Sequence, residues 1–567
     1  MRAFARRLFA GAVLLAASSG AASAAPRALT PEALRGRIVG AVPALAPVKI
    51  HVVLPGRNEA ELDRLIDVQS DASSPEFGAY LTPQEFGRYF GADPALYADA
   101  LATLRAGGFQ IVETANNRRD IVASAPAAVV SRFFATPLDL HVERGRTFYA
   151  ARFEPAIPAR LHALAVTGLE DYHVMHSHRR VRPGSSIGGV FSWAPADVAL
   201  AYDFGPLYTA GLNGKGITIA NATAAAATAS DLAHFQSAFK LPAAKLVSTP
   251  IDGALSTSCG SGCDNGESTL DADWATATAR GATFHQVVAH TAGNGDFDDV
   301  YKYIVDSLGA SVHVVTTSWG TCEHDMPRSE VTLDDGYFKQ AVAEGQWWFS
   351  ASGDNGTDDC DDGSTTALSV DYPGSSPYVV SVGGTNVHAS INAAGNVTKY
   401  GSETAWEYGN CSETDGLSSN GAGGGGRSIL YAKPSYQTGV TPADGRRDVP
   451  DVSLLADDVN DGLWIYQGGL QGGNGGTSEA APQWAGLLAI VEQHRANYKA
   501  VANPHVRLYQ LAIKSRKTYF HDVIGGNNGV PACAGDIAVF GGYNAVAGFD
   551  LASGLGSYIA TPLVEAY

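Results

Sequence analysis

The stretch Gly475-Gly476-Thr477-Ser478-Glu479-Ala480-Ala481-Pro482 decides how the second half of this chain is interpreted. Its glycines allow a sharp turn and let another molecule approach the backbone closely. Ser478 precedes an apolar run, 484–491, that is typical of a buried helix. A serine at such a loop-to-helix junction is placed as a nucleophile, because the positive end of the helix stabilises an anion that forms there. The alternative is a plain helix N-cap, so the interpretation depends on finding a base and an oxyanion donor elsewhere.

Length and composition indicate a multidomain α/β protein. The chain has 567 residues, 45% of them hydrophobic and 17% charged, and 64 are glycine. A single core rarely grows past about 300 residues, so more than one domain is expected. The net charge is −18, with a slightly basic first third and a strongly acidic remainder. Nucleic acid is therefore excluded as a partner of the acidic part, because phosphates would be repelled. The excess of acidic residues can be explained by solubility alone. The alternative is that the protein functions at acidic pH.

Residues 1–24 are typical of a signal peptide. Arginines stand at positions 2, 6 and 7, an apolar core covers 8–17, and Ala22-Ser23-Ala24 is a small-residue cleavage site. The apolar run is too short to span a bilayer and no later stretch qualifies, so we expect an exported protein that does not enter the membrane. Export permits disulfides. Six cysteines allow 15 pairings: Cys259, Cys263, Cys322, Cys360, Cys411 and Cys533.

Residues 45–172 alternate between strand and helix patterns and predict a compact ferredoxin-like α+β domain. No catalytic cluster is evident in it. Its expected strands are 48–54 and 109–114, and its expected helices are 59–69, one that begins at Pro83 with Thr82 as N-cap, and 94–107.

Residues 173–189 are polar, basic and turn-prone, which predicts an exposed linker open to proteolysis. Three histidines, at 173, 176 and 178, raise metal binding as an alternative. A solvated linker explains them more simply.

The remainder of the chain, from Ser192 onward, predicts one large α/β domain with a doubly wound parallel sheet, because strands alternate with helices. Expected strands are 216–220, 312–317, 347–351 and 378–382, and expected helices are 270–279, 333–344 and 484–497.

Two acidic segments in this domain are candidates for the chemistry. Glu267 and Asp271 are four residues apart, so on a helix they share a face, where two carboxyls can share one proton and serve as a general base. A solvated acidic face is the alternative. Asp354, in Ser352-Gly353-Asp354-Asn355-Gly356, follows a predicted strand, and a protonated carboxyl there can donate to an oxyanion; a turn aspartate is the alternative. Ser318-Trp319-Gly320 could line an extended substrate, or simply end a strand.

These motifs together resemble a known family of peptidases. Gly-Thr-Ser-x-x-x-Pro at 476–482 is shared with subtilisin-like serine proteases, but none of the 15 histidines precedes a glycine, as a subtilisin would require. The pattern instead resembles the sedolisins, the serine-carboxyl peptidases, which keep the subtilisin-type fold and replace the histidine by glutamate. Their Glu-x-x-x-Asp matches Glu267 and Asp271, and their Ser-Gly-Asp-x-Gly matches the segment around Asp354.

The resemblance implies a role for each of these residues. Ser478 is the expected nucleophile, Glu267 its general base, and Asp271 the partner that orients Glu267 and shares its proton. Asp354 is the expected oxyanion acid. The resemblance extends to the front of the chain, where Ser74 to Pro83 is similar to the family's activation domain. It implies a signal peptide (1–24), an activation prodomain (25–172), a cleavable linker (173–189) and a catalytic peptidase domain (190–567).

The family also implies one calcium ion near the C-terminus. His521-Asp522-Val523-Ile524 and 548–556 are similar to the two halves of its site. Asp522 and Asp550 would supply carboxylates, and Val523, Val546 and Gly548 would supply backbone carbonyls. Two Asx turns without metal are the alternative.

A disulfide between Cys322 and Cys360 is likewise implied by the resemblance. Cys259 and Cys263 are then expected to pair with each other or to be cross-linked elsewhere, and Cys411 is assigned to Cys533.

The expected function is that of a secreted, monomeric, acid-active endopeptidase made as a zymogen. Its substrates would be proteins or peptides, and its own prodomain would inhibit it until it processes itself. Two alternatives remain from the sequence: an inactive exported homologue that binds peptides, and a serine hydrolase that acts on esters.

Overall fold

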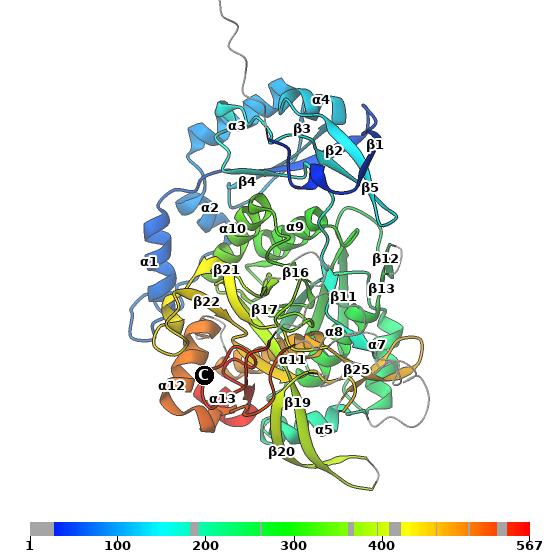
Figure 1. The fold of residues 1–567 in the computed structure, drawn as a ribbon. Coiled ribbons are helices and arrows are strands. Elements are labelled where there is room, and N and C mark those ends of the chain that lie inside the picture. The colour runs from blue at the N-terminus through cyan, green and yellow to red at the C-terminus, as the bar shows by residue number, and fades with distance from the viewer. Residues whose placement is uncertain are drawn as a thin grey trace, which may run out of the picture.

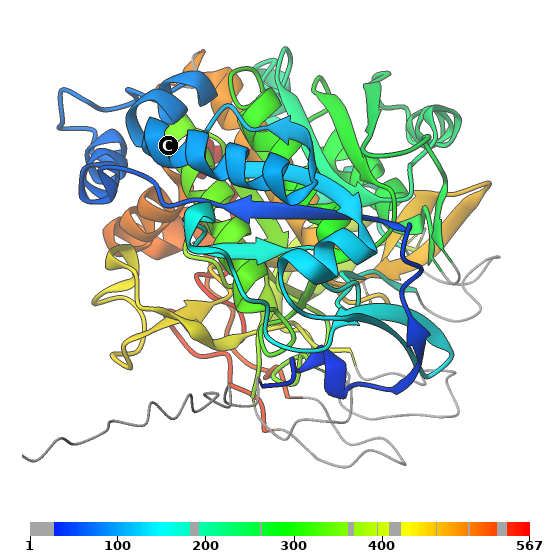
Figure 2. The same cartoon turned by 90° about the horizontal axis from the view of Figure 1, so that it is seen from above.

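The computed structural model describes residues 28–181, 192–260, 263–360, 368–393, 395–407, 421–460, 462–496, 499, 501–529 and 541–567. The expected signal peptide and Cys411 and Cys533 lie outside these ranges. A smaller N-terminal domain sits on top of a larger α/β domain (Figure 1). Seen from above, the smaller domain spans the upper face of the larger one (Figure 2).

The N-terminal domain contains a four-stranded antiparallel sheet in the order β3-β4-β2-β7. Helices α3 (Pro94–Gly107) and α4 (Ala127–Phe133) cover one face, where Ile50 of β2 and Leu104 of α3 are fully buried in one core. This strand order and helix placement are those of the predicted ferredoxin-like α+β domain. The strands are β2 (Pro47–Val53), β3 (Gln110–Thr114), β4 (Asp120–Pro126) and β7 (Ala165–Thr167).

The opposite face of that sheet packs on the large domain. Because side chains alternate along a strand, His51 and Val53 point away from the first core, and Val53 joins a cluster with residues of the large domain. A second sheet, β1-β5-β6, lies beside the first. It is made of β1 (Arg37–Ala41), β5 (Leu138–Glu143) and β6 (Arg146–Ala151), and short 3-10 turns occupy Glu32–Leu34 and Ala159–Leu161.

Two helices carry the chain down the side of the molecule (Figure 1). They are α1 (Glu59–Ser70) and α2 (Pro83–Phe90), and Leu62 and Phe86 pack with Ala343 of the large domain. Helix α2 begins at the predicted position: the Thr82 side chain accepts from the Glu85 N–H, and the Glu85 side chain accepts from the Thr82 N–H. This reciprocal capping box satisfies two otherwise unpaired donors.

The large domain is built on a mostly parallel sheet in the order β11-β14-β10-β15-β17-β19-β20, with β23 paired to β19. All pairings are parallel except β19 with β20. Helices cover both faces, so the doubly wound α/β prediction is confirmed. The strands are β10 (Thr218–Ala224), β11 (Lys245–Pro250), β14 (Thr283–Ala289), β15 (Val314–Thr317), β17 (Trp347–Ala351), β19 (Val379–Ile391), β20 (Val397–Ala405) and β23 (Val452–Leu455).

Helices α8 (Gly266–Thr278) and α11 (Thr477–Arg495) pack in the core on one face of this sheet. Helices α9 (Asn294–Lys302) and α10 (Arg328–Glu344) pack on the other, where the N-terminal domain docks. The remaining helices are α5 (Pro195–Ala201), α6 (Gly205–Thr209), α7 (Ala229–Ala238), α12 (Pro504–Tyr519) and α13 (Ala560–Ala566), with single turns at Tyr303–Ser307 and Ser435–Gln437.

Short strands complete the large domain around the ends of the main sheet. They are β8 (His176–Ser177), β9 (Arg180–Val181), β12 (Ser258–Gly260), β13 (Cys263–Asp264), β16 (Trp319–Cys322), β18 (Asp371–Tyr372), β21 (Gly426–Ala432), β22 (Arg446–Val449), β24 (Leu463–Tyr466), β25 (Leu470–Gly475), β26 (Phe520–His521) and β27 (Ser557–Tyr558).

Two helices begin earlier than the sequence predicts. The predicted 270–279 helix begins at Gly266 and the predicted 484–497 helix begins at Thr477. The first residues of both helices are polar, so they do not show the apolar spacing from which a helix is predicted. As a result, the candidate catalytic residues Glu267 and Ser478 lie in the first turns of these helices.

Ion pairs of both polarities join the two domains. Lys49 of the N-terminal domain contacts Asp252 and Asp299 of the large domain. Conversely, Lys339 of the large domain contacts Glu59 and Asp63, with Nζ–Oδ1 of Asp63 at 2.6 Å, and Lys302 contacts Glu113. Each domain therefore supplies both basic and acidic residues to the interface, and the contact is not simply between a basic domain and an acidic one. Within the described ranges, no helix has both the length and the apolarity needed to cross a membrane.

Candidate active site

Ser478 and Glu267 meet between the N-terminal turns of two helices. Ser478 is the second residue of α11 and Glu267 the second of α8, and both are buried. The Ser478 hydroxyl donates to Glu267 Oε2 at 3.0 Å. Gly476, at φ 94°, is the N-cap residue of α11 and makes no side-chain cap. The alternative interpretation of Ser478 as the N-cap is therefore wrong, and its side chain is available for chemistry.

Asp271 lies one turn after Glu267 on α8 and is completely buried. Ser318 Oγ donates to its Oδ1 at 2.6 Å, and Asn221 Nδ2 donates to its Oδ2 at 2.9 Å. Asn221 is part of β10, and Ser318 directly follows the neighbouring strand β15 at its carboxyl end, where an open α/β fold presents its sites. Glu267 and Asp271 therefore form a buried pair rather than the solvated acidic face that was the alternative.

Asp354 follows β17 and faces the beginning of α11. Its Oδ1 accepts from the Thr477 N–H at 2.7 Å and from Thr477 Oγ1 at 2.9 Å. A methyl group placed on Gly476 would lie 2.0 Å from the His178 carbonyl oxygen and 2.5 Å from Asp354 Oδ2. These two oxygens thus converge on one point that only a glycine leaves free. Asp354 Oδ2 and the His178 carbonyl oxygen therefore lie on the same side of Gly476.

The three carboxyls are all held in an environment that favours protonation. Burial raises the pKa of Glu267, and the charge of Asp271 raises it further. Burial also raises the pKa of Asp271. The pKa of Asp354 is raised by burial, which outweighs the opposing effect of Arg180 and His178. Because charged forms are disfavoured away from water, this site retains protons above the pH at which exposed carboxyls would lose them.

The segment predicted as an exposed linker lies in the cleft instead. In its described part, β8 pairs antiparallel with β16, and β9 pairs antiparallel with β25. Met175 and His178 are buried. His176, Ser177 and Val181 are exposed, as predicted, so the prediction of exposure holds only in part. Polar and basic residues also bind in a cleft, which composition alone does not reveal. The prediction that Ser318-Trp319-Gly320 lines an extended chain agrees with the pairing of β16.

This segment crosses the candidate nucleophile as an extended peptide. The His178 N–H donates to the Ser318 carbonyl at 3.1 Å, and Ser177 pairs with Trp319 across the ladder. The Ser177 hydroxyl donates to Glu267 Oε2, the same oxygen that accepts from Ser478. The peptide bond between His178 and Arg179 is the one whose carbonyl oxygen lies beside Gly476 and Asp354.

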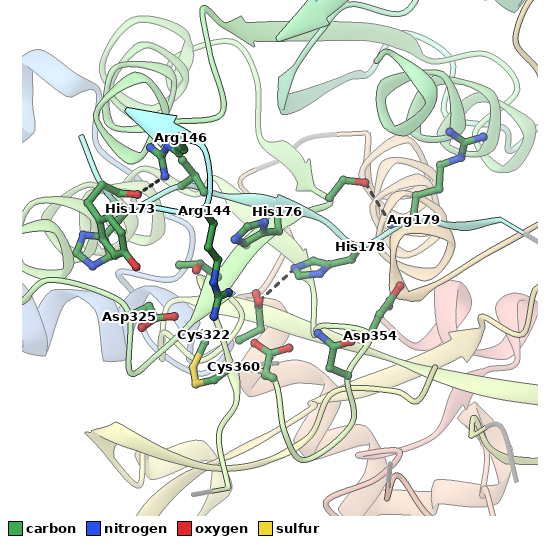
Figure 3. Close-up of a pocket in the computed structure, with 18 of the residues that line it drawn as sticks. Arg144, Arg146, His173, His176, His178, Arg179, Cys322, Asp325, Asp354 and Cys360 are labelled. Atoms are coloured by element: carbon green, nitrogen blue, oxygen red, sulfur yellow. Dashed lines mark hydrogen bonds and ion pairs between the residues drawn. A yellow bond between two sulfur atoms is a disulfide. The ribbon is translucent and has the colours of Figure 1, made fainter. Parts of the chain in front are cut away.

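Cavities border the segment on both sides. One, of about 620 Å³, is lined by His173, His176, His178 and Asp354 together with Arg144 and Arg146 of the N-terminal domain (Figure 3). His178, labelled in Figure 3, contacts the wall of this cavity: its Nε2 lies 3.2 Å from Asp371 Oδ2. The other, of about 820 Å³, is lined by Arg179, Asp264 and Glu267. The segment thus occupies a channel wide enough for a peptide and its side chains.

Known proteins share this architecture. The sequence profile described as "Pro-kumamolisin, activation domain" matches residues 36–172, and that of the "Subtilase family" matches residues 257–522. Sedolisin of Pseudomonas sp. (strain 101) is 31% identical over 529 residues, covering 90% of this chain and 85% of the relative. Kumamolisin of Bacillus sp. (strain MN-32) is 30% identical over 547 residues, covering 92% and 91%. The chain belongs to the sedolisin family. It is a serine peptidase of the sedolisin type with an activation prodomain.

A solved sedolisin structure supports the same fold. Pseudomonas sedolisin, described as a serine-carboxyl proteinase complexed with two molecules of pseudo-iodotyrostatin, has a TM-score of 0.55 and 28% identity to this chain. The comparison covers 67% of this chain and 98% of that one. From here we call the N-terminal domain the prodomain and the large domain the catalytic domain.

The roles of several polar residues of this sedolisin site were not predicted from the sequence, although Ser318 and Asn355 lie in segments that were singled out. Asn221 and Ser318 hold Asp271, and Asn474 and Asn355 bind side chains of the cleft segment. Their positions in the sequence could have indicated these roles. Each residue lies in or directly after a strand, or in a glycine-rich loop beside a predicted catalytic residue.

Both disulfides that the structure describes border the cleft. Cys322 pairs with Cys360, as the family resemblance implied, and Cys259 pairs with Cys263. The assignment of Cys411 to Cys533 falls outside the described residues. The first disulfide joins β16, which binds the cleft segment, to the loop that follows Asp354.

The residues expected to bind calcium come together at one end of the catalytic domain. Asp522 accepts from the Gly548 N–H at 3.1 Å, and Asp550 accepts from the Val546 N–H at 2.9 Å. Strands β26 and β27 bring the two halves of the chain side by side. Arg516 Nη1 also lies 3.5 Å from Asp522 Oδ1. Carboxylate oxygens such as those of Asp522 and Asp550 are ligands of the kind that calcium takes. Val523 is buried beside them.

We expect Glu267→Gln to raise the melting temperature of the pro-protein more at about pH 9 than at about pH 5. Because the pKa of Glu267 is raised in the fold, its neutral form is stable at low pH, and stability is lost as the pH rises through that pKa. Glutamine stays neutral at both values. Thermal unfolding in a Ser478→Ala background measures the effect, with Glu565→Gln on the outer face of α13 as control. An equal shift at both pH values would contradict the raised pKa.

Proposed function

We propose that this chain is a secreted, acid-active endopeptidase that is made as a zymogen and cuts its own linker. The observation that carries the proposal is the hydrogen bond between Ser478 Oγ and buried Glu267, with a peptide carbonyl and Asp354 beside it. Export is inferred from the signal-like residues 1–24. Protein and peptide substrates would enter the cleft that the linker now occupies.

The arrangement supplies each part of acyl transfer. Ser478 Oγ attacks the substrate carbonyl carbon while Glu267 accepts its proton. The negative charge that develops on the carbonyl oxygen accepts a hydrogen bond from protonated Asp354, and the N-terminal end of α11 adds favourable potential. Glu267 then returns the proton to the leaving amine. Water repeats the sequence on the acyl-enzyme and releases Ser478.

Acid dependence follows from the protonation that this mechanism requires. Glu267 and Asp271 act as a pair, and the second proton leaves less readily than the first because it must leave beside an existing charge. The active pair holds one proton and still presents one ionised carboxyl oxygen as base. Asp354 must hold its proton to donate, so activity fades as the pH rises through its pKa.

Latency would end by cleavage of the linker between His178 and Arg179. The bound segment acts as an intramolecular inhibitor, and the prodomain holds it in place through interface contacts such as Lys49 with Asp299. Burial raises the pKa of Asp299, but His51 and Lys49 lower it more, so the net pKa lies below its usual range. That contact therefore persists in mild acid, because Asp299 stays ionised there. Acid would activate the site, and the prodomain would be released after the linker has been cut.

Two other functions remain to be separated from this one. A peptide-binding homologue without activity would not need the serine-to-carboxyl hydrogen bond. A serine esterase would use the same nucleophile but would not cut peptides.

Digestion of an unfolded protein between about pH 3 and pH 8 tests the proposal. We expect wild type to process itself and then to release peptides in the acid range only, and Ser478→Ala to do neither, because it lacks the nucleophile. Mass spectrometry of the products separates endopeptidase from esterase activity. Pure Ser478→Ala that still processes itself in acid would contradict autocatalysis, and full activity at pH 8 with none at pH 4 would contradict the carboxyl mechanism.

Two variants of Asp354 serve as matched controls in that assay. Asp354→Ala removes the donor and should cost about 10²–10³ in rate in the acid range, where wild-type Asp354 holds its proton. Asp354→Asn keeps an N–H donor that does not titrate, so the activity that it retains should extend to higher pH than that of wild type. An identical upper pH limit for the Asp354→Asn variant and the wild-type enzyme would exclude Asp354 as the titrating donor.

We also propose that one calcium ion binds at Asp522, Val523, Val546, Gly548 and Asp550, where it would cross-link the two C-terminal segments. A ligand that binds only the folded state raises its stability. We expect chelation to lower the melting temperature of wild type, calcium to restore it, and magnesium to restore it poorly because magnesium demands a smaller octahedral site. Asp522→Asn should be insensitive to both. Unchanged melting of wild type after chelation would overturn this site.

A further inference from the structure

We infer that the enzyme prefers peptides that carry arginine at the first two positions after the cut bond, and that Asn474, Asp264 and Asn355 recognise these side chains. The inference deepens the proposed function and rests on it. It is drawn from the cleft segment, in which Arg179 and Arg180 follow the His178 carbonyl that lies beside Gly476 and Asp354. The leaving-group side of the cleft is thus seen with two arginines bound.

Arg179 is held by a hydrogen-bonded fork. Its Nε and Nη2 donate to Asn474 Oδ1 at 3.1 and 2.9 Å. Asn474 is itself fixed, because its Nδ2 donates to the Leu463 carbonyl at 3.3 Å and to the Gln471 carbonyl at 3.0 Å. The acceptor oxygen is therefore oriented before an arginine arrives, which reduces the entropy cost of binding.

The space around Arg179 is shaped for a guanidinium group. A methyl group on Gly266 would lie 1.6 Å from Arg179 Nη1, so the glycine makes room for the side chain. Burial lowers the pKa of the Arg179 guanidinium, and the charges of Asp264, Glu267 and Glu479 oppose this effect. Asp264 also lines the 820 Å³ cavity beside Arg179. A neutral side chain at this position would leave Asn474 Oδ1 without its donors, and an acidic one would be repelled.

Arg180 has a separate set of partners on the opposite wall. Its Nη2 donates to Asn355 Oδ1 at 2.6 Å and to the Asp354 carbonyl at 3.1 Å. Its Nε lies 3.4 Å from Asp354 Oδ2. The backbone at this point is paired with Gly475 in the β9–β25 ladder. Because the ladder fixes the register, successive side chains point to opposite walls, and each wall supplies acceptors for one arginine.

Arginine should be favoured over lysine at the first position. Lysine carries the charge but presents a single ammonium group, so it cannot reproduce the two parallel contacts with Asn474 Oδ1. The two positions should contribute separately, since their partners lie on different elements and do not overlap.

Internally quenched peptides test the inference on enzyme that has processed itself from the full chain in acid. All carry Val-Met-His-Ser-His before the cut bond, and differ only in the next two residues: Arg-Arg, Lys-Arg, Ala-Arg, Arg-Ala, Ala-Ala and Glu-Glu. Hydrogen bonds from a charged guanidinium contribute more than those between neutral groups. We therefore expect kcat/KM for Arg-Arg to exceed that for Ala-Ala by at least about tenfold, with Ala-Arg and Arg-Ala between them and Glu-Glu lowest.

Variants test which residues cause the preference for arginine. For each variant, the rates of cleavage of two peptides are compared as a ratio, so that a general loss of activity cancels. Asp264→Asn and Gly266→Ala should lower the ratio of Arg-Arg to Ala-Arg cleavage, and Asn355→Ala should lower the ratio of Arg-Arg to Arg-Ala. Asp252→Asn, on the prodomain-facing surface, should change neither ratio. Equal cleavage of all six peptides would overturn the inference and leave the peptidase proposal standing. Cleavage of none, by a chain that also fails to process itself, would overturn both.

Discussion

The hydrogen bond from the Ser478 hydroxyl to the Glu267 carboxyl is the interaction on which the rest of the site depends. It requires a carboxyl that stays in place at the buried end of a helix, and burying a carboxyl is costly unless it keeps a proton or finds donors. The fold meets this requirement with neighbouring strands, since Asn221 and Ser318 donate to Asp271 beside it. Among the described residues it is a carboxyl, not a histidine, that accepts from Ser478.

Much of the fold and the identity of the four candidate catalytic residues could be predicted from the sequence. Strand and helix periodicity indicated both domains, because apolar faces must be buried whatever the details of the site. Glu267 and Asp271 were found by their helical spacing, and Ser478 and Asp354 by glycine-rich turns next to predicted strands and helices. The family resemblance gave these residues their order and roles.

The path of the linker could not be predicted in the same way. Residues such as Ser177, Arg179 and Arg180 are polar, and polarity usually indicates solvent exposure. Their actual environment is a cleft lined by acceptors from distant parts of the sequence, such as Asn474. No local pattern encodes such pairing, because the β8–β16 and β9–β25 ladders exist only once the catalytic domain has assembled. The earlier starts of α8 and α11 were missed for a related reason. Their first turns are polar, so they lack the regular spacing of apolar residues that indicates a helix.

The bound linker connects the catalytic geometry to latency and to specificity. The same segment that blocks the cleft presents its own peptide bond to Ser478, and its arginines occupy the positions where a substrate's leaving group would bind. Its hydrogen bond from Ser177 to Glu267 also competes for the oxygen that must accept the nucleophile's proton. In the proposed account, this one short segment would serve as inhibitor, first substrate and guide to later substrates.

The identity of the first bond cut on acidification tests this account most directly. Purified pro-protein is brought to acid, quenched at the earliest times, and the fragments are identified by intact mass and N-terminal sequencing. The account predicts a catalytic fragment that begins at Arg179 and a complementary prodomain fragment that ends at His178, before any trimming. A first cut at any other bond would contradict the assignment of the His178 carbonyl to the oxyanion position beside Asp354.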